Sequence, residues 1–390
     1  MRGRFPSRLI VAVSLTLLFP IACRFVTADE PAAKPKAESQ DLLARWNKLL
    51  AQRDDVGKKA QALQREFLTA KDARKLEIRQ EFQKLVTDFS KTIEPQIMEL
   101  APQVFAKDPG NVDAAEIAVG GLFQDNKYTE ALAAADKAVA ELKKDKKSSG
   151  NLLNLQGVSL FATHQFEKAQ EVLKEAQKAD PEAFAQLGAR YLDSAAEYVK
   201  LWKDEQAIRA KEAKADDLPR VSFKTSKGDI VLELFENEAP NTVANFISLV
   251  EKKKYDGTKF HRVIPTFMAQ GGDPNSLDDD PTNDGGGGPG YRIACECYAK
   301  NARKHFAGSL SMAHAGKDTG GSQFFLTHLP TPHLDVEIAR KRGGDGHTVF
   351  GRVIEGLEIA QSLRVGDKIE SATVIRKREH EYKPKSLPGR

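Results

Sequence analysis

The spacing of apolar residues changes at Leu218-Pro219, and this change divides the chain into two kinds of structure. Before it, apolar residues recur at steps of three and four, which is typical of amphipathic helices. After it, they alternate with polar residues between glycine-rich turns, which is typical of strands. We therefore expect a multidomain protein with an all-α region over residues 41–215, a strand-rich domain over 219–377 and a tail over 378–390.

The first part of the helical region, residues 41–110, contains two runs with helical spacing, over 42–67 and 78–104. Each run presents an apolar stripe that must pack on another helix, so an antiparallel helical hairpin is predicted. Pro95 and Pro102 fall in the second run and predict breaks or kinks there, because proline lacks an N–H and clashes with the preceding turn.

Residues 111–215 contain two degenerate copies of one pattern of small and large apolar residues. The pattern resembles the tetratricopeptide repeat, in which small residues lie where two antiparallel helices approach. Residues 182–213 are expected to cap the pair, because two units bury too little surface alone. True repeats would offer a concave face for a protein partner; a scaffold role and a generic helical bundle are the alternatives. The pattern is carried by Gly157, Phe166, Ala169, Leu173, Ala176 and Pro181 and, 38 residues earlier, by Tyr128, Ala131, Ala135 and Ala138.

The N-terminus has the order of features found in secretory signal peptides. Three arginines precede an apolar run over residues 9–19, which is too short to span a bilayer, and residues 26–28 offer a cleavage site. A signal peptide over 1–28 and a flexible linker over 29–40 are predicted, so the protein is expected in the periplasm or outside the cell, without a membrane span after cleavage. An uncleaved anchor and lipid attachment at Cys23 are the alternatives.

The formal net charge of +4 comes from this N-terminal segment. The chain has 59 basic and 55 acidic residues, and residues 1–28 hold four arginines and no acid, so the remainder has 55 of each. A balanced remainder gives no support to nucleic-acid binding, which needs a clustered basic surface.

Within residues 219–377, short strands are interrupted by few helices. A β-hairpin is predicted around a turn at 226–229, and helices are predicted from Pro240 and near 357–363. The domain is therefore expected to be an α+β fold or a β-barrel.

Three sequence blocks in this domain resemble the cyclophilin family. They read FHRVIPTFMAQGGD over residues 260–273, GSLSMAHAG continuing through GSQFFLT over 308–327, and GHTVFGRV over 346–353. The resemblance covers about 219–377. It implies a prolyl cis-trans isomerase with a closed eight-stranded antiparallel β-barrel capped by two helices, acting on proline-containing polypeptides and assisting protein folding.

The resemblance also implies a set of site residues. Arg262 matches the catalytic arginine, Gln270 a polar group that holds the peptide backbone or orients the arginine, and His347 a histidine at the floor of the pocket. The remaining matches are to substrate-binding positions, namely Phe267, Met268, Ala313, His314, Gln323, Phe325 and Leu334. No cofactor and no metal are implied.

The expected chemistry needs no covalent catalyst. The barrier to rotation about an X–Pro bond is about 18–20 kcal/mol, because twisting destroys amide resonance. The twisted prolyl nitrogen becomes a hydrogen-bond acceptor, so a guanidinium fixed beside an apolar pocket can stabilise the transition state. A chaperone or assembly scaffold that binds proline-containing segments without catalysis is the alternative function.

Several segments depart from the family pattern. His333 stands where many eukaryotic members have a tryptophan, which puts affinity for cyclosporin-type inhibitors in doubt. Residues 336–345 are longer than the usual turn and are predicted as a solvated loop; a gate to the pocket and a contact with acidic substrates through the basic residues 340–342 are the alternatives. Residues 275–290 are rich in Asp and Gly but lack the glutamate of a calcium loop.

Cys295 and Cys297 are predicted to share one strand. They are interpreted as packing residues or as a strained redox pair. A zinc site is not predicted, because no histidines lie at the spacing that it requires.

Overall fold

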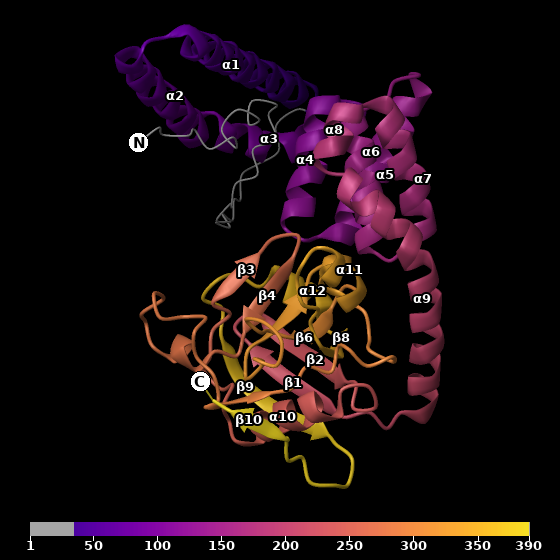
Figure 1. Cartoon of the computed structure of the whole chain (residues 1–390). Helices are drawn as coiled ribbons and strands as arrows, with labels where there is room; N and C mark the ends of the chain where they lie inside the picture. Colours follow the sequence, from indigo (N-terminus) through magenta and orange to yellow (C-terminus); the bar gives the residue numbers. More distant parts are fainter. Residues whose placement is uncertain (1–34, 390) are drawn as a thin grey trace. The chain divides into compact units, whose positions relative to one another are not determined.

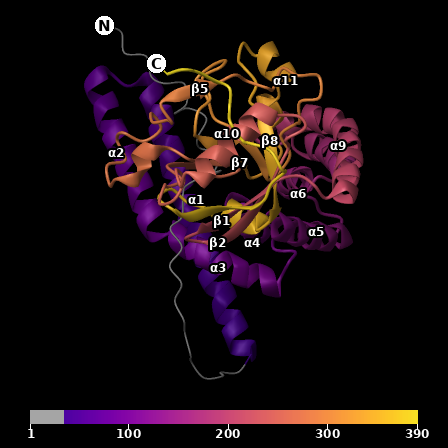
Figure 2. The ribbon, with the colours of Figure 1, turned by 90° about the horizontal axis from the view of Figure 1, so that it is seen from below.

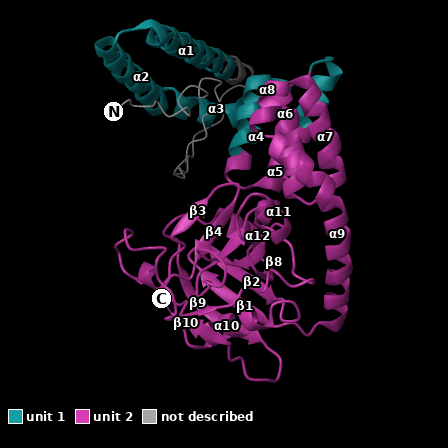
Figure 3. Cartoon of the chain, viewed as in Figure 1, with its two compact units in different colours: residues 1–121, 137–147 teal, residues 122–136, 148–390 magenta. Residues whose placement is uncertain are grey.

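The computed structural model describes residues 35–389, so the signal peptide, Cys23 and the first part of the linker, all expectations from sequence, lie outside the described residues. The chain divides into two compact units (Figure 3). The first comprises Met1–Gly121 and Lys137–Lys147, and the second comprises Leu122–Asp136 and Ser148–Arg390. Among the described residues, no helix combines the length and the apolar character that a membrane span requires.

The first unit is helical, and a tryptophan lies at the centre of its core. Trp46 is fully buried, together with residues of the third helix such as Leu100 and Val104. The first helix therefore packs against the third as well as the second, so the simple hairpin expected from sequence becomes a three-helix arrangement. The helices are α1 (Pro35–Thr69), α2 (Asp72–Thr92), α3 (Glu94–Lys107), the larger part of α4 (Val112–Gln124) and the end of α5 (Tyr128–Lys144).

Two local expectations in this unit are corrected. Helix α1 begins at Pro35, within the segment predicted as a flexible linker. Proline is tolerated in the first turn of a helix, where its missing N–H has no partner to lose. The break predicted at Pro95 is confirmed, because α2 ends at Thr92 and Pro95 lies in the first turn of α3. Pro102, by contrast, lies inside α3 and does not end it. The buried residues around Pro102, including Ala101 and Val104, hold this helix together through their packing.

The helices of the second unit pack closely in pairs, as in helical repeats. Phe166, Ala169 and Leu173, singled out from the sequence pattern, are fully buried. Gly157 permits the close approach of two helices, because a Cβ atom there would lie 2.7 Å from Leu173 Cδ2. The helices are the start of α5, then α6 (Gly150–Ala162), α7 (Phe166–Ala179), α8 (Pro181–Gln186) and α9 (Ala189–Ala215).

The remainder of the second unit is an antiparallel sheet with helices packed on it (Figure 1). The expected hairpin forms, with Phe223 opposite Ile230. The sheet order is β3-β4-β7-β6-β8-β2-β1-β9, and β10 pairs separately with β5. The strands are β1 (Arg220–Thr225), β2 (Gly228–Leu234), β3 (Arg262–Ile264), β4 (Met268–Gly271), β5 (Tyr291–Ile293), β6 (Ser309–Met312), β7 (Phe324–Thr327), β8 (Val349–Glu355), β9 (Ile369–Arg376) and β10 (Ser386–Pro388).

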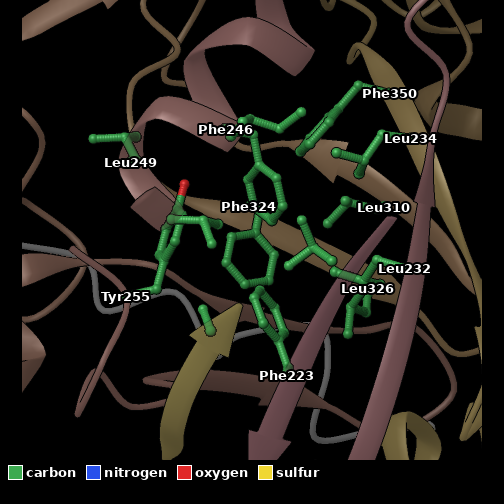
Figure 4. Close-up of a cluster of buried hydrophobic side chains, with 14 of the residues drawn as sticks. Phe223, Leu232, Leu234, Phe246, Leu249, Tyr255, Leu310, Phe324, Leu326 and Phe350 are labelled. Atoms are coloured by element: carbon green, nitrogen blue, oxygen red, sulfur yellow. The ribbon is translucent and has the colours of Figure 1, made fainter. Parts of the chain in front are cut away.

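The core of this domain consists of large side chains enclosed by the curled sheet (Figure 4). Phe223, Phe246 and Phe324 meet there in tilted and edge-to-face contacts, a geometry that aromatic rings prefer. Helices α10 (Pro240–Glu251) and α12 (Leu357–Ser362) pack on the sheet.

The sheet is curled but not closed into the barrel expected from the resemblance. Its edge strands β3 and β9 share no ladder among the described residues. One isolated bridge, between Lys259 and Lys368, and a few irregular hydrogen bonds join the segments that lead into them. The physical reason is that residues 257–260, which precede β3, make the bonds across this edge with residues 366–369, while β3 itself pairs in a ladder with β4 alone among the described strands.

Three further expectations differ from the structure. The segment 336–345, predicted as a loop, begins with the short helix α11 (Val336–Lys341). Cys295 and Cys297 do not lie on a strand, because β5 ends at Ile293, and both are free thiols. In the predicted tail, β10 extends the structure by pairing with β5.

The close contact at Gly157 makes a test of the helical packing. We expect Gly157→Ala to lower the free energy of unfolding by about 1–3 kcal/mol, because the added methyl group must displace the buried Leu173 side chain. Urea unfolding followed by far-UV circular dichroism measures this change. Gly57→Ala is the matched control, since nothing lies within 4 Å of its added Cβ and helix propensity favours alanine. Equal stability of the two variants would contradict the packing argument.

Candidate active site

The site is built on the hairpin formed by β3 and β4. Arg262 lies opposite Gln270 across this hairpin. The arginine side chain is exposed, and its Nη1 donates a hydrogen bond to Gln270 Oε1 at 3.2 Å. The turn of the hairpin contains Thr266 at a φ of +58° and closes with a hydrogen bond from the Phe267 N–H to the Ile264 carbonyl. One edge of the guanidinium is thus held while the side chain stays open to solvent.

Two glutamine side chains, those of Gln270 and Gln323, fix the orientation of the guanidinium through hydrogen bonds to each other and to a loop. Gln270 Nε2 donates to Gln323 Oε1 at 2.9 Å. Gln323 Nε2 donates in turn to the carbonyl oxygens of Gly285 and Gly287, each at 2.9 Å. A glutamine side-chain amide has its donor nitrogen on one side and its acceptor oxygen on the other. Because the Gln270 nitrogen donates to Gln323, the Gln270 oxygen must face Arg262.

Asp273 supports this relay, and sequence reasoning missed its role. Its carboxylate is fully buried and accepts hydrogen bonds from the N–H groups of Gly285 and Gly287. These bonds fix the Asp- and Gly-rich loop whose carbonyls hold Gln323. Asp273 ends the first of the three sequence blocks, so its place in that block was the available signal.

An apolar surface adjoins the polar relay. Met268 and Phe325 are buried and lie on the paired strands β4 and β7. Phe267 is half-buried, with its ring 5.3 Å from the ring of His333. Leu334 is half-buried, and its carbonyl accepts a hydrogen bond from the His347 N–H at 3.0 Å.

His347 is held as a neutral ring beside Phe325. Burial, together with a smaller effect of the neighbouring His314, lowers the pKa of His347 to about 3. Its Nδ1 lies 3.0 Å from the Met312 carbonyl, which assigns the proton to Nδ1. The ring stacks on His314 at 4.1 Å and meets Phe325 edge-to-face at 5.4 Å.

The last two predicted residues lie on the chain that follows β6. The Ala313 N–H donates to the Gln323 carbonyl at 3.0 Å, so only the Ala313 carbonyl is left for another partner. His314 Nε2 lies 2.9 Å from the Gly346 carbonyl. The predicted residues thus form two linked groups, a polar one around Gln270 and an apolar one around Phe325, which are joined where Gln270 pairs with Phe325.

A buried hydrogen-bond chain lies behind the apolar group, and no motif indicated it. His305 Nδ1 is 2.7 Å from Asp335 Oδ1, and its Nε2 is 2.9 Å from Ser311 Oγ. The arrangement has the residue types of a hydrolytic triad, but the Ser311 side chain is fully buried and donates to the Thr348 carbonyl. These hydrogen bonds therefore fix the His305 ring, which stacks parallel to the ring of Phe325 and supports it.

No group of three potential metal ligands occurs among the described residues. The site offers a fixed guanidinium beside an apolar surface, which can donate hydrogen bonds to an acceptor and exclude water.

Comparison with known proteins places this site within a recognised family. The family model for "Cyclophilin type peptidyl-prolyl cis-trans isomerase/CLD" matches residues 220–380. A peptidyl-prolyl cis-trans isomerase of Synechococcus elongatus is 50% identical over 155 residues, which cover 39% of this chain and 94% of that protein. One of Helicobacter pylori is 47% identical over 169 residues, which cover 42% of this chain and 93% of that protein.

A crystal structure of a cyclophilin-type isomerase from Cryptosporidium parvum was also matched. It shares 28% sequence identity with this chain, covers 41% of this chain and 99% of its own, and has a TM-score of 0.33. Membership of the family is established by the two sequence relatives and not by this structural similarity. The family match begins after the helical region.

The buried His328 makes the free energy of unfolding depend on pH. Burial lowers the pKa of His328 to about 3, from an ordinary value of 6.5. As the pH falls below 6.5, the unfolded chain therefore binds a proton that the native protein does not, and the free energy of unfolding decreases. We expect His328→Met to flatten this decrease by up to about 1.4 kcal/mol per pH unit between pH 6 and 4. Chemical unfolding at several pH values measures it.

His380 provides the control for this test. Its side chain is exposed, and its carbonyl and carboxylate partners raise its pKa. His380→Gln should therefore leave the acid-side decrease at least as steep as in the wild type. An identical pH dependence for the wild type and His328→Met would contradict the assignment.

Proposed function

This chain belongs to the cyclophilin-type peptidyl-prolyl cis-trans isomerase family, and we propose that Arg262 performs the catalysis by binding the twisted X–Pro amide of polypeptide substrates. The single observation that carries this role is the guanidinium held by Gln270 beside the apolar surface of Met268 and Phe325. Isomerase activity itself is supported by relatives at about half identity.

Arg262 acts by differential binding. In the planar amide the prolyl nitrogen is conjugated and accepts no hydrogen bond, whereas in the twisted form it does. A guanidinium has several N–H donors in a rigid fork, and the bond to Gln270 uses only one of them. The remaining donors reach the nitrogen and the neighbouring carbonyl, so the enzyme binds the transition state better than either planar isomer.

The apolar surface receives the proline ring. Met268 and Phe325 are buried by the protein itself, so they are fixed before the substrate binds. The ring covers the exposed parts of the half-buried Phe267 and Leu334 beside them and removes water from beside the guanidinium, which strengthens its hydrogen bond. His347 stays neutral at physiological pH because of its lowered pKa. It therefore contributes shape and hydrogen bonding, and no proton transfer is required.

The polypeptide on either side of the proline binds along the chain after β6. Ala313 offers its carbonyl, since its N–H is already bonded to the Gln323 carbonyl. His314 completes this edge through its contact with His347. Recognition by one carbonyl and an apolar pocket suits unfolded segments of many sequences, which is the substrate class of a folding catalyst.

Removal of the guanidinium tests the catalytic role. We expect Arg262→Ala to lower kcat/KM about 10²–10³-fold in a protease-coupled assay of a proline-containing peptide, because it removes the only proposed donor to the prolyl nitrogen. Arg262→Lys keeps the charge without the fork and should recover only a small part of the activity. Undiminished activity of Arg262→Ala would rule out this mechanism, while inactivity of the wild type would rule out the isomerase function.

Export is a separate proposal, supported by the basic, apolar and small residues in sequence order over residues 1–28. Cleavage after Ala28 would leave Asp29 as the first residue of the mature protein. N-terminal sequencing of protein recovered from the exported fraction checks this expectation. Recovery of the chain only from the cytoplasm with its N-terminus intact would contradict it. Partner binding by the helical region stays a prediction.

A further inference from the structure

A buried asparagine outside the family-matched region contacts the catalytic hairpin. Asn126 lies in the turn between α4 and α5, at a φ of +62°, and only 1% of its surface is exposed. It belongs to the same compact unit as the sheet. Its side-chain oxygen accepts hydrogen bonds from the Thr266 N–H at 2.7 Å and from the Tyr128 hydroxyl at 2.8 Å.

Thr266 is the strained residue of the turn between β3 and β4. Its φ of +58° is unfavourable for a β-branched side chain. The turn joins the strand of Arg262 to the strand of Met268, so its conformation sets the guanidinium relative to the apolar surface. The bond from Asn126 holds the backbone N–H in this conformation.

The amide nitrogen of Asn126 is linked to Phe267, the next residue of the same turn, through a series of hydrogen bonds. It donates to the Gln361 carbonyl at 2.9 Å. The Gln361 side chain donates to the His328 carbonyl at 2.8 Å, and the His328 N–H donates to the Phe267 carbonyl at 2.9 Å. One side chain of the helical region thus fixes two successive residues, Thr266 and Phe267.

A second helical residue is hydrogen-bonded to Asp335, which holds the histidine behind Phe325. Tyr198 of α9 is fully buried, and its hydroxyl donates to Asp335 Oδ2 at 2.6 Å. The other oxygen of Asp335 holds His305, which supports Phe325. Asp335 also follows Leu334 directly in the chain. Helix α9 runs beside the sheet in both views (Figures 1 and 2).

We propose that Asn126 and Tyr198 are positioning residues of the isomerase, so that helical residues outside the family-matched region form part of the working site. This inference rests on the proposed role of Arg262. Catalysis by hydrogen bonding depends steeply on placement, and a shift of about 1 Å can reduce a rate about 10²-fold. Without these two contacts, the hairpin turn would lose the hydrogen bond to the Thr266 N–H, and Asp335, which holds His305 behind Phe325, would lose its bond from Tyr198.

Asn126→Gly in the full-length protein tests the first contact. Glycine keeps the positive φ and removes only the amide. We expect kcat to fall about tenfold with little change in KM, and amide hydrogen exchange at Thr266 to accelerate. Lys146→Gly is the matched control: Lys146 also has a positive φ in a turn between helices, but its side chain is exposed. It should leave both kcat and the exchange at Thr266 unchanged.

Two further variants separate positioning from loss of stability. Asn126→Asp keeps an oxygen that accepts from Thr266 but replaces the donor to the Gln361 carbonyl, so we expect its kcat to lie below that of the wild type and above that of Asn126→Gly. Tyr198→Phe removes only the hydroxyl bond to Asp335, and we expect a fall in kcat of about threefold to tenfold while the protein stays folded by circular dichroism. If Asn126→Gly fails to fold, Asn126→Asp and Tyr198→Phe carry the test.

The inference is overturned if the folded variants keep kcat within twofold of the wild type. In that case a large loss in Arg262→Ala would leave the proposed function intact, whereas full activity of Arg262→Ala would instead remove the basis of both proposals. Faster exchange at Thr266 without a change in kcat would show a structural contact that catalysis does not use, and would also overturn the inference.

Discussion

The pairing of β4 with β7 is the constraint on which the site depends. Its register places Gln270 opposite Phe325 and Met268 opposite Thr327. Side chains alternate between the faces of a strand, so a slip of one residue would turn Gln270 and Met268 to the wrong faces. The same register brings Gln270 Nε2 within 2.9 Å of Gln323 Oε1 and so determines which way its oxygen points. That ladder orients Gln270, and Gln270 in turn holds Arg262 across the β3–β4 hairpin.

The helical part of the second unit is attached to the sheet by buried charges as well as by Asn126 and Tyr198. Arg303 is almost completely buried and donates to Glu205 and Glu212 of α9. Arg352 of β8 donates to the same Glu212 and to Glu233. Buried ions gain little net stability but are costly to leave unpaired. Such a network therefore favours one arrangement of α9 against the sheet over loosely docked alternatives, which suits residues that must hold a catalytic turn.

Much of the second unit could be predicted from sequence because its signals are local. The alternation around residues 226–229 predicted the first hairpin, and the spacing of apolar residues after Pro240 predicted α10. The resemblance supplied the site residues, and Gln270 and Gln323 do meet. The helix at 336–341 was missed because six residues give too short a period to recognise. The open edge of the sheet was missed because it depends on how residues 257–260 bond to residues 366–369, which are distant in sequence and leave no local pattern.

Local chemistry in the chain was sufficient to establish its helical and strand-rich halves, its family and the residue types of its site. Periodicity and short motifs depend on neighbouring residues, whose geometry is limited by backbone sterics. The contacts of Asn126 with Thr266 and of Tyr198 with Asp335 join residues 140 and 137 positions apart. Such pairs are formed when the folded chain brings distant segments together, and the sequence around either residue shows no periodic pattern that would indicate its partner. For that reason, the assignment of helical residues to the site had to wait for the folded arrangement.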